Sequence, residues 1–250
     1  MMSDAVADGL VLRQFSLNDH WSVDWLAALR QDIASGQIVI LKGAVEPGNA
    51  RALRDMILAW RDNQPCVPFT VDTNGPGINF HRIDADPTKS QLPHRFHQHG
   101  FGAVSDLPAD LRTAILKIAG RMLMLQNAVA QTEYHLDMPE VRVKVLQYPQ
   151  GGGFLANHAH PLRPQQVGLI LALAEAGTDY INGGTTFVTP RGTVDTGPQH
   201  NLGDLILFRY DLQHAVTPVD EDKPLSWAAP GGRWTLVLEL LTTHARSEAT

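Results

Sequence analysis

The sequence contains a single cysteine, Cys66, in 250 residues. One cysteine excludes an internal disulfide and any metal site built from several cysteines. No run of about 18 or more apolar residues occurs, so we expect no membrane span. The first ten residues contain two aspartates and no basic residue ahead of an apolar stretch. We therefore expect no signal peptide and a cytoplasmic location.

Basic residues are outnumbered by acidic ones. The 20 lysines and arginines face 26 aspartates and glutamates, for a formal net charge of −6. This balance disfavours nucleic acid as a partner. No internal repeat is evident, and a hydrophobic fraction of 44% suffices for a buried core. We expect one domain over residues 1–250, and its oligomeric state stays open.

Apolar residues recur at helical spacing in three stretches of the first 140 residues. The pattern predicts helices over 21–36, 49–62 and 110–133. Short apolar runs predict strands at 9–15 and 38–43. The second run is continuously apolar, so we expect both of its faces to be buried.

Periodicity disappears between residues 63 and 102, where proline, glycine, aspartate and histidine are frequent. The segment also contains four phenylalanines, which disordered segments usually lack, so it predicts an ordered loop that forms a lid. Protonatable and basic residues cluster there: His81, Arg82, His94, Arg95, His97 and His99. Two interpretations stay open, a solvated loop with scattered histidines or side chains that face a substrate, an anionic one among the options.

From residue 141 onward, the sequence changes to strands separated by turns. Apolar runs predict strands at 141–148, 167–174, 185–189, 205–209, 216–219 and 233–241. We therefore expect helical support and a lid in residues 1–140 and a β-rich barrel core in residues 141–245.

Two histidines separated by one residue, His158 and His160, follow a glycine-rich stretch. Alternate side chains of an extended chain point the same way, and neutral imidazole binds metals. His214 follows an apolar strand whose end can aim a side chain inward. Arg233 begins the last strand, and its planar charge suits bidentate pairing with a carboxylate. A histidine pair alone is a weak signal, because two surface histidines produce the same pattern.

The whole ordered series from 142 to 241 resembles the Fe(II)/2-oxoglutarate-dependent oxygenases. In that family a glycine-rich approach leads to H-x-D or H-x-E, a second histidine follows, and an R-x-S/T pair lies in a late strand. The matching residues here are His158, His214, and Arg233 with Thr235. The stretches Asn182-Gly183-Gly184-Thr185 and 203–208 (GDLILF) are similar to two further strand-linking motifs of the family.

The resemblance implies a mainly β fold, a double-stranded β-helix (a jelly-roll, cupin-like barrel) flanked by α-helices. It implies Fe(II) near one mouth of the barrel, with His158, His160 and His214 as metal ligands and catalytic residues. Arg233 would hold the distal carboxylate of the cosubstrate 2-oxoglutarate, with Thr235 as a hydroxyl donor. Tyr148 and Asn182 are weaker candidates for the polar lining of that pocket. The reaction would use molecular oxygen to oxidise, most simply by hydroxylation, an unidentified small molecule.

The sequence departs from the family at His160, which stands where the family has a carboxylate ligand. Three interpretations stay open. His160 is a true third ligand, or it swings away and leaves a coordination position open, or the site has lost oxygenase activity. Two alternative functions also stay open: a 2-oxoglutarate-independent dioxygenase with three histidine ligands, and a non-catalytic barrel that binds a small carboxylate.

Overall fold

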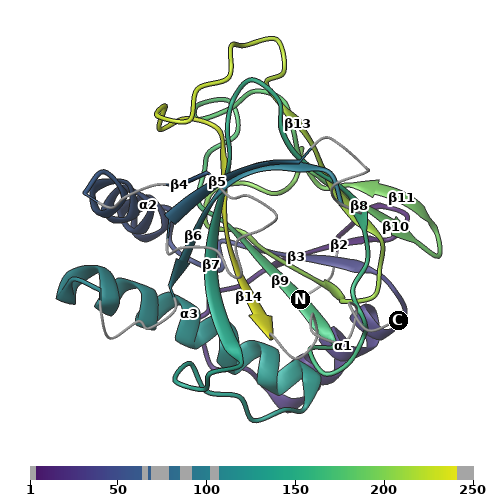
Figure 1. Cartoon of the computed structure of the whole chain (residues 1–250). Coiled ribbons are helices and arrows are strands. Elements are labelled where there is room, and N and C mark those ends of the chain that lie inside the picture. Colours follow the sequence, from purple (N-terminus) through teal and green to yellow (C-terminus); the bar gives the residue numbers. More distant parts are fainter. Residues whose placement is uncertain (1–3, 64–66, 69–78, 85–91, 102–106, 241–250) are drawn as a thin grey trace.

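The computed structural model describes residues 4–63, 67–68, 79–84, 92–101 and 107–240 (Figure 1). The helices are α1 (Val23–Ala34), α2 (Pro47–Arg61) and α3 (Ala109–Ala130). The strands are β1 (Asp4–Ala7), β2 (Leu10–Gln14), β3 (Ile38–Lys42), β4 (Val67–Pro68), β5 (Asn79–Asp84), β6 (His94–Phe101), β7 (Val141–Tyr148), β8 (Gly153–His158), β9 (Val167–Ala172), β10 (Thr185–Thr189), β11 (Gly192–Asp195), β12 (Leu205–Arg209), β13 (His214–Val219) and β14 (Arg233–Leu240).

The last eight strands form two sheets, and each strand except β11 lies in the sheet opposite to that of the strand before it. One sheet has the order β12-β9-β14-β7 and the other has the order β8-β13-β10-β11, with antiparallel neighbours in both. Strand β6 pairs with β7 and with β8, so it joins the two sheets along one edge. This arrangement is the double-stranded β-helix that the family resemblance implies, and the expected fold class is confirmed.

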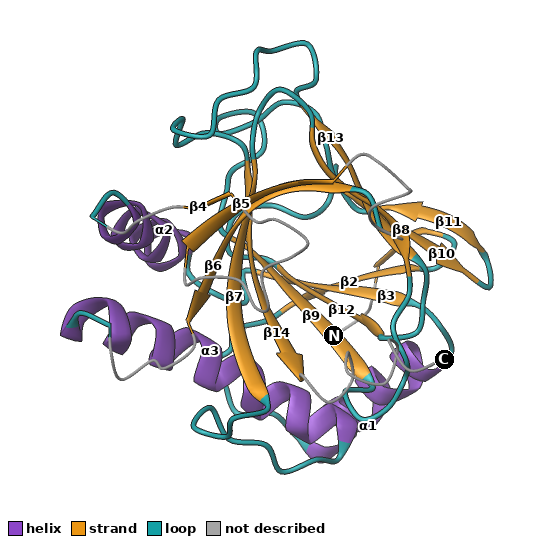
Figure 2. Ribbon diagram, in the orientation of Figure 1, coloured by secondary structure: helices purple, strands orange, loops and turns teal. Residues whose placement is uncertain are grey.

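The N-terminal part extends and covers the first sheet. Strand β3 pairs with β12, and β2 runs parallel to β3. Residues 38–41 of β3 are fully buried, as their continuous apolar run predicts. Helix α1 packs on β3 and β12, and α3 packs on β9 and β14, so both helices lie on the outer face of this sheet (Figure 2). The interior of the barrel is left free for a site.

The three predicted helices are confirmed, with ends that shift by a few residues. Ser22 caps α1, because its hydroxyl accepts a hydrogen bond from the backbone N–H of Trp25. Pro47 occupies the first turn of α2, where its missing N–H costs nothing. Helix α3 ends at Gln131, which adopts a left-handed conformation (φ 56°). None of the described helices is long and apolar enough to cross a membrane.

The prediction of an irregular loop over 63–102 is wrong for the part that the structure describes. Strand β5 pairs with β6 in antiparallel register, and β6 belongs to the barrel. Four polar residues occupy buried positions in β6, namely His94, His97, Gln98 and His99. They replace the apolar residues by which a strand is usually recognised. The rest of the segment predicted as a lid, and the side chains of His81 and Arg82, lie outside the described residues.

Candidate metal centre

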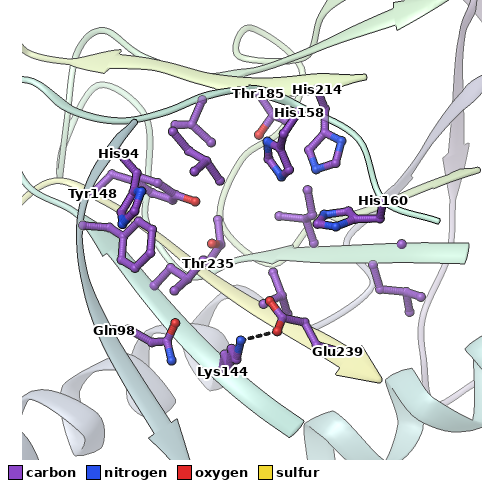
Figure 3. A pocket seen from close by; sticks show the side chains of 18 of the residues that line it. His94, Gln98, Lys144, Tyr148, His158, His160, Thr185, His214, Thr235 and Glu239 are labelled. Atoms are coloured by element: carbon purple, nitrogen blue, oxygen red, sulfur yellow. Dashed lines mark hydrogen bonds and ion pairs between the residues drawn. The ribbon is translucent and has the colours of Figure 1, made fainter. Parts of the chain in front are cut away.

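The pairing of two strands brings three histidines together. His158 ends β8, His214 begins β13, and the two residues lie directly opposite one another. Their ring centroids are 4.2 Å apart. His160, two residues beyond β8, has its ring centroid 4.8 Å from that of His158 and 5.3 Å from that of His214. One nitrogen from each ring lies within 4.8 Å of the others, which is close enough for one metal ion (Figure 3).

Hydrogen bonds and stacking orient these rings. The Nδ1 atom of His158 lies 2.9 Å from the carbonyl oxygen of Ala156, and Nδ1 of His214 lies 2.9 Å from that of Leu212. If each Nδ1–H donates to its carbonyl, Nε2 is left as the metal-binding atom. The ring of His160 stacks on Tyr210, with centroids 4.4 Å apart and planes tilted by 14°. The protein therefore holds all three rings in place without help from a metal.

The electrostatics of the cluster favour neutral imidazole. Burial, with a smaller contribution from nearby His158, lowers the pKa of His214 to about 3. His214 is therefore neutral at pH 7, and a neutral ring is what a metal cation requires.

The three histidines lie beside a cavity of about 340 Å³ inside the barrel. This volume is within the range of sites for small molecules. Alternate residues of two neighbouring strands line the cavity: Arg233, Thr235, Val237 and Glu239 from β14, and Lys144, Leu146 and Tyr148 from β7. Arg233 and Tyr148 lie opposite one another in the sheet and form what we call the inner end of the cavity. Lys144, Glu239 and Gln98 of β6 form the outer end.

Arg233 is 3% exposed, and its Nη2 atom donates a hydrogen bond of 2.7 Å to the hydroxyl of Thr185. Its guanidinium carbon lies 5.7 Å from the ring centroid of Tyr148. Among the described residues, no carboxylate forms an ion pair with Arg233. A buried charge without a counter-charge is costly, so this position suits a ligand that supplies a carboxylate.

The other predicted pocket residues divide into two groups. Tyr148 and Thr235 line the cavity, at 3% and 2% exposure. Burial raises the pKa of Tyr148 to about 12, so its hydroxyl stays protonated. Asn182 does not reach the cavity: it is exposed and borders a separate surface hollow. Its backbone N–H donates to the carboxylate of Asp220, which fixes the turn, and Thr185 projects inward instead.

The cluster of basic and protonatable residues predicted in 94–99 also divides. His94 lines the cavity and is 3% exposed. Arg95 instead donates to the carbonyl oxygens of Gly151 and Gly152 at 3.1 and 3.3 Å. The ring of His99 stacks on Trp234, a residue that does not line the cavity. Of these three side chains, only that of His94 lines the cavity. The interpretation that side chains of this cluster face a substrate therefore remains open for His94, and Arg95 and His99 have other contacts.

Sequence reasoning missed several residues of the cavity: Lys144, Glu239, Gln98, Tyr210, Thr185 and, as a strand residue, His94. A signal existed for two of them. Lys144 and Glu239 are charged residues inside apolar strands, and each shares the inward face with a predicted site residue, Tyr148 and Arg233 respectively. A charged residue that lies an even number of positions from a site residue on a buried strand points to the same face, so it indicates a second group in the same cavity.

No protein-family model matches the chain, and no curated protein matches it by sequence. Solved structures do match. A prolyl-4-hydroxylase from Pseudomonas putida is 18% identical with a TM-score of 0.55, over 86% of this chain and 97% of that one. A prolyl hydroxylase from Trichoplax adhaerens, in complex with a peptide fragment of the hypoxia inducible factor oxygen degradation domain, is 14% identical with a TM-score of 0.58, over 92% and 98%. The non-heme α-ketoglutarate-dependent epimerase SnoN of nogalamycin biosynthesis is 15% identical with a TM-score of 0.52, over 87% and 83%.

These similarities cover between 86% and 92% of this chain. At such low identity they establish the fold, which is that of the Fe(II)/2-oxoglutarate oxygenases. The family resemblance read from the motifs and the structural similarity thus agree.

Proposed function

We propose that this protein is an Fe(II)/2-oxoglutarate-dependent oxygenase that oxidises a small molecule at a face of three histidines. One observation supports it above the others. The barrel holds three converging histidines and, in the same cavity, a buried arginine that no described carboxylate neutralises. The three histidines would hold a metal ion, and the arginine would pair with the carboxylate of a ligand.

The residues present fit Fe(II). His158, His160 and His214 would hold it, because three imidazoles whose nitrogen atoms converge form an N₃ face suited to divalent first-row metals. When bound, iron and 2-oxoglutarate supply oxygen activation through oxidative decarboxylation of the cosubstrate. The replacement of a carboxylate by His160 leaves the metal one positive charge richer, which favours a dianionic cosubstrate.

The chain itself supplies binding, orientation and exclusion of water. Arg233 would bind the distal carboxylate of 2-oxoglutarate, held in position by its hydrogen bond to Thr185. Thr235, next along the inward face of β14, would donate its hydroxyl to the same ligand. The apolar walls of the cavity, among them Leu146, Phe208 and Val237, keep water away from the reacting atoms.

Iron content and turnover test this proposal. The full chain would be loaded with Fe(II) under anaerobic conditions, freed of excess metal and assayed for iron and for succinate released from 2-oxoglutarate in air. We expect about one iron per chain, as one set of three histidines allows, and succinate release that requires both iron and oxygen.

Two variants make the test specific. His214→Ala should lose iron and succinate release, because it removes a ligand. His135→Ala, a change at an exposed histidine outside the cavity, should keep both. Full iron content in His214→Ala would refute the ligand assignment. Iron binding with oxygen consumption that ignores 2-oxoglutarate would refute the cosubstrate.

A further inference from the structure

The three histidine rings lie on different kinds of backbone. His158 and His214 belong to paired strands, and the Nδ1 atom of each lies 2.9 Å from a carbonyl oxygen two residues earlier in the chain. His160 lies two residues beyond the end of β8, outside any strand (Figure 3). The χ1 angle of a histidine has three staggered positions, and strand geometry does not select one of them here. A contact with the ring itself is therefore needed to direct it toward the other two.

The ring of Tyr210 lies face to face with the ring of His160. The two centroids are 4.4 Å apart and the planes are tilted by only 14°. The planes of His158 and His214 meet that of His160 at 84° and 48°. The nitrogen lone pair with which an imidazole binds a metal lies in the plane of the ring. A stacked neighbour therefore covers one face of His160 and leaves its metal-binding edge free to point toward the other histidines.

Tyr210 is itself held in place. It is 4% exposed and packs in an apolar cluster that includes Phe187 of β10 and Phe208 of β12. Its backbone N–H donates a hydrogen bond of 3.0 Å to the carbonyl oxygen of Gln166. The chain from His160 to Gln166 thus contacts Tyr210 at both of its ends, through the stacked ring at the first residue and the hydrogen bond at the last. A close-packed ring of this kind restricts the orientation of its neighbour.

The position of Tyr210 in the chain links it to the metal site. Tyr210 follows β12 directly, and His214 begins β13 four residues later. One connection between strands therefore supplies both a candidate ligand and the ring that stacks on another. A carboxylate at position 160, as in the H-x-D or H-x-E motif, would have no ring to stack. The stacked contact depends on the imidazole by which this sequence departs from that motif.

We propose that Tyr210 is a positioning residue of the metal site: its ring holds the imidazole of His160 in the orientation that faces His158 and His214, so that His160 serves as the third ligand. Tyr210 acts through His160. Of the three interpretations of His160, the inference selects the true ligand. It rests on the metal site of the oxygenase proposed above and names the residue on which the third ligand depends.

The Fe(II) affinity of the full chain tests the inference, measured by anaerobic titration against a competing chelator. Tyr210→Leu removes the ring and keeps an apolar side chain. We expect it to bind Fe(II) about three- to tenfold more weakly, the scale of one aromatic pair. Tyr210→Phe keeps the ring and should restore the affinity. Tyr134→Leu, the same change at a half-buried tyrosine outside the cavity, is the matched control and should bind Fe(II) as the wild type does.

The His160→Asp background separates positioning from general packing. Aspartate has no ring to stack, so Tyr210→Leu should leave the Fe(II) affinity of His160→Asp unchanged. A residue that only stabilised the barrel would lower the affinity by the same factor in both backgrounds, because independent effects add in free energy.

The iron-free protein provides a readout that needs no metal. With isotope-labelled histidine, nuclear Overhauser contacts between the ring protons of His160 and His158 report the orientation of His160. These contacts should be present in the wild type and in Tyr210→Phe, and they should weaken in Tyr210→Leu.

Three results would overturn the inference: wild-type Fe(II) affinity in Tyr210→Leu, an equal loss in the His160→Asp background, or ring contacts that Tyr210→Leu leaves unchanged. The proposed function is read separately, from succinate released from 2-oxoglutarate. If Fe(II) binding follows the predicted pattern and no succinate forms, the oxygenase proposal fails while the role of Tyr210 remains. If the wild type releases succinate and Tyr210→Leu binds Fe(II) as tightly, the inference fails and the oxygenase proposal stands. No Fe(II) binding by the wild type would refute both.

Discussion

The two ends of the cavity handle charge in opposite ways. At the inner end, Arg233 is buried beside neutral groups, the Thr185 hydroxyl and the Tyr148 ring. At the outer end, Lys144 already contacts Glu239. Among the described residues, the inner end therefore carries a positive charge without a counter-charge, and the outer end carries a pair of opposite charges.

This difference indicates which end suits a carboxylate ligand. A buried positive charge without a described counter-charge binds a carboxylate whatever the rest of the ligand is, which suits a cosubstrate common to many reactions. At the outer end Lys144 already has a carboxylate beside it, so a second one gains less there. The histidine cluster belongs to neither end, because β8 and β13 supply it from the opposite sheet.

The largest effect is expected at His160, the residue by which the proposed metal site departs from the H-x-D or H-x-E motif that the sequence resembles. His160→Ala should weaken Fe(II) binding about 100-fold or more, as loss of a ligand exceeds the effect of losing a ligand's supporting hydrogen bond. His160→Asp, which supplies the usual carboxylate, should retain iron. Iron titration monitored by metal content distinguishes the two variants. Wild-type affinity in His160→Ala would show that His160 swings away from the metal.

A smaller effect is expected from Thr185→Val, which keeps the shape of the side chain and removes its hydroxyl. Arg233 then loses its 2.7 Å hydrogen bond and its fixed orientation. We expect 2-oxoglutarate to bind about tenfold more weakly, the scale of one hydrogen bond to a charged group. Fe(II) binding should not change, because Thr185 is not one of the three converging histidines. Calorimetry with 2-oxoglutarate and with Fe(II) checks this separation, and an equal loss for both would contradict it.

The burial of His200, together with the positive charge of the inner end, also predicts a pH dependence. Burial, and then the charge of Arg233, lowers the pKa of His200 from 6.5 to about 3. Between these values the unfolded chain binds a proton that the folded chain does not, so stability falls as pH drops from 6.5 toward 3. The contribution is about 1.4 kcal/mol per pH unit. Above pH 6.5 His200 is neutral in both the folded and the unfolded chain, so this destabilisation is absent there.

Urea unfolding of the iron-free protein across this pH range measures the slope. His200→Gln should lose that part of the slope, because glutamine does not titrate and its amide can donate to the carbonyl oxygen of Asp204 as His200 does. His135→Gln, at an exposed histidine, is the control and should keep the wild-type slope. Identical slopes for wild type and His200→Gln would contradict the assignment.

The smallest effect concerns the ion pair of the outer end in the absence of ligand. Lys144→Met should change the free energy of unfolding by about 1 kcal/mol or less, because solvent reaches both side chains and screens the pair. Chemical denaturation measures it. A loss several times larger would mean that the pair holds β7 to β14, and its role would then be structural.

Much of the site could be read from the sequence because its signals are local. An H-x-H pair after a glycine-rich stretch, a histidine after an apolar strand and an arginine in the last strand are short patterns, and the register of β8 and β13 brings them together. The apolar runs of β3, β7, β9 and β12 likewise identify strands without any tertiary information.

The rest depended on contacts between distant residues. Strand β6 was missed because His94, His97 and Gln98 are buried there in place of apolar residues, and only its pairing with β7 and β8 explains their burial. Asn182 was expected in the pocket, but its hydrogen bond to Asp220, 38 residues away, fixes the turn with Asn182 outside.

The most direct test is an anaerobic titration of the iron-loaded protein with 2-oxoglutarate, followed by the visible charge-transfer band of the metal chelate. The wild type, Arg233→Met and Lys144→Met would be compared. The account predicts a saturable band for the wild type, the same affinity for Lys144→Met, and at least about a 30-fold weaker affinity for Arg233→Met, the lower end of the cost of removing a desolvated charge partner. No band with iron bound, or an equal loss in both variants, would contradict a cosubstrate site at the inner end.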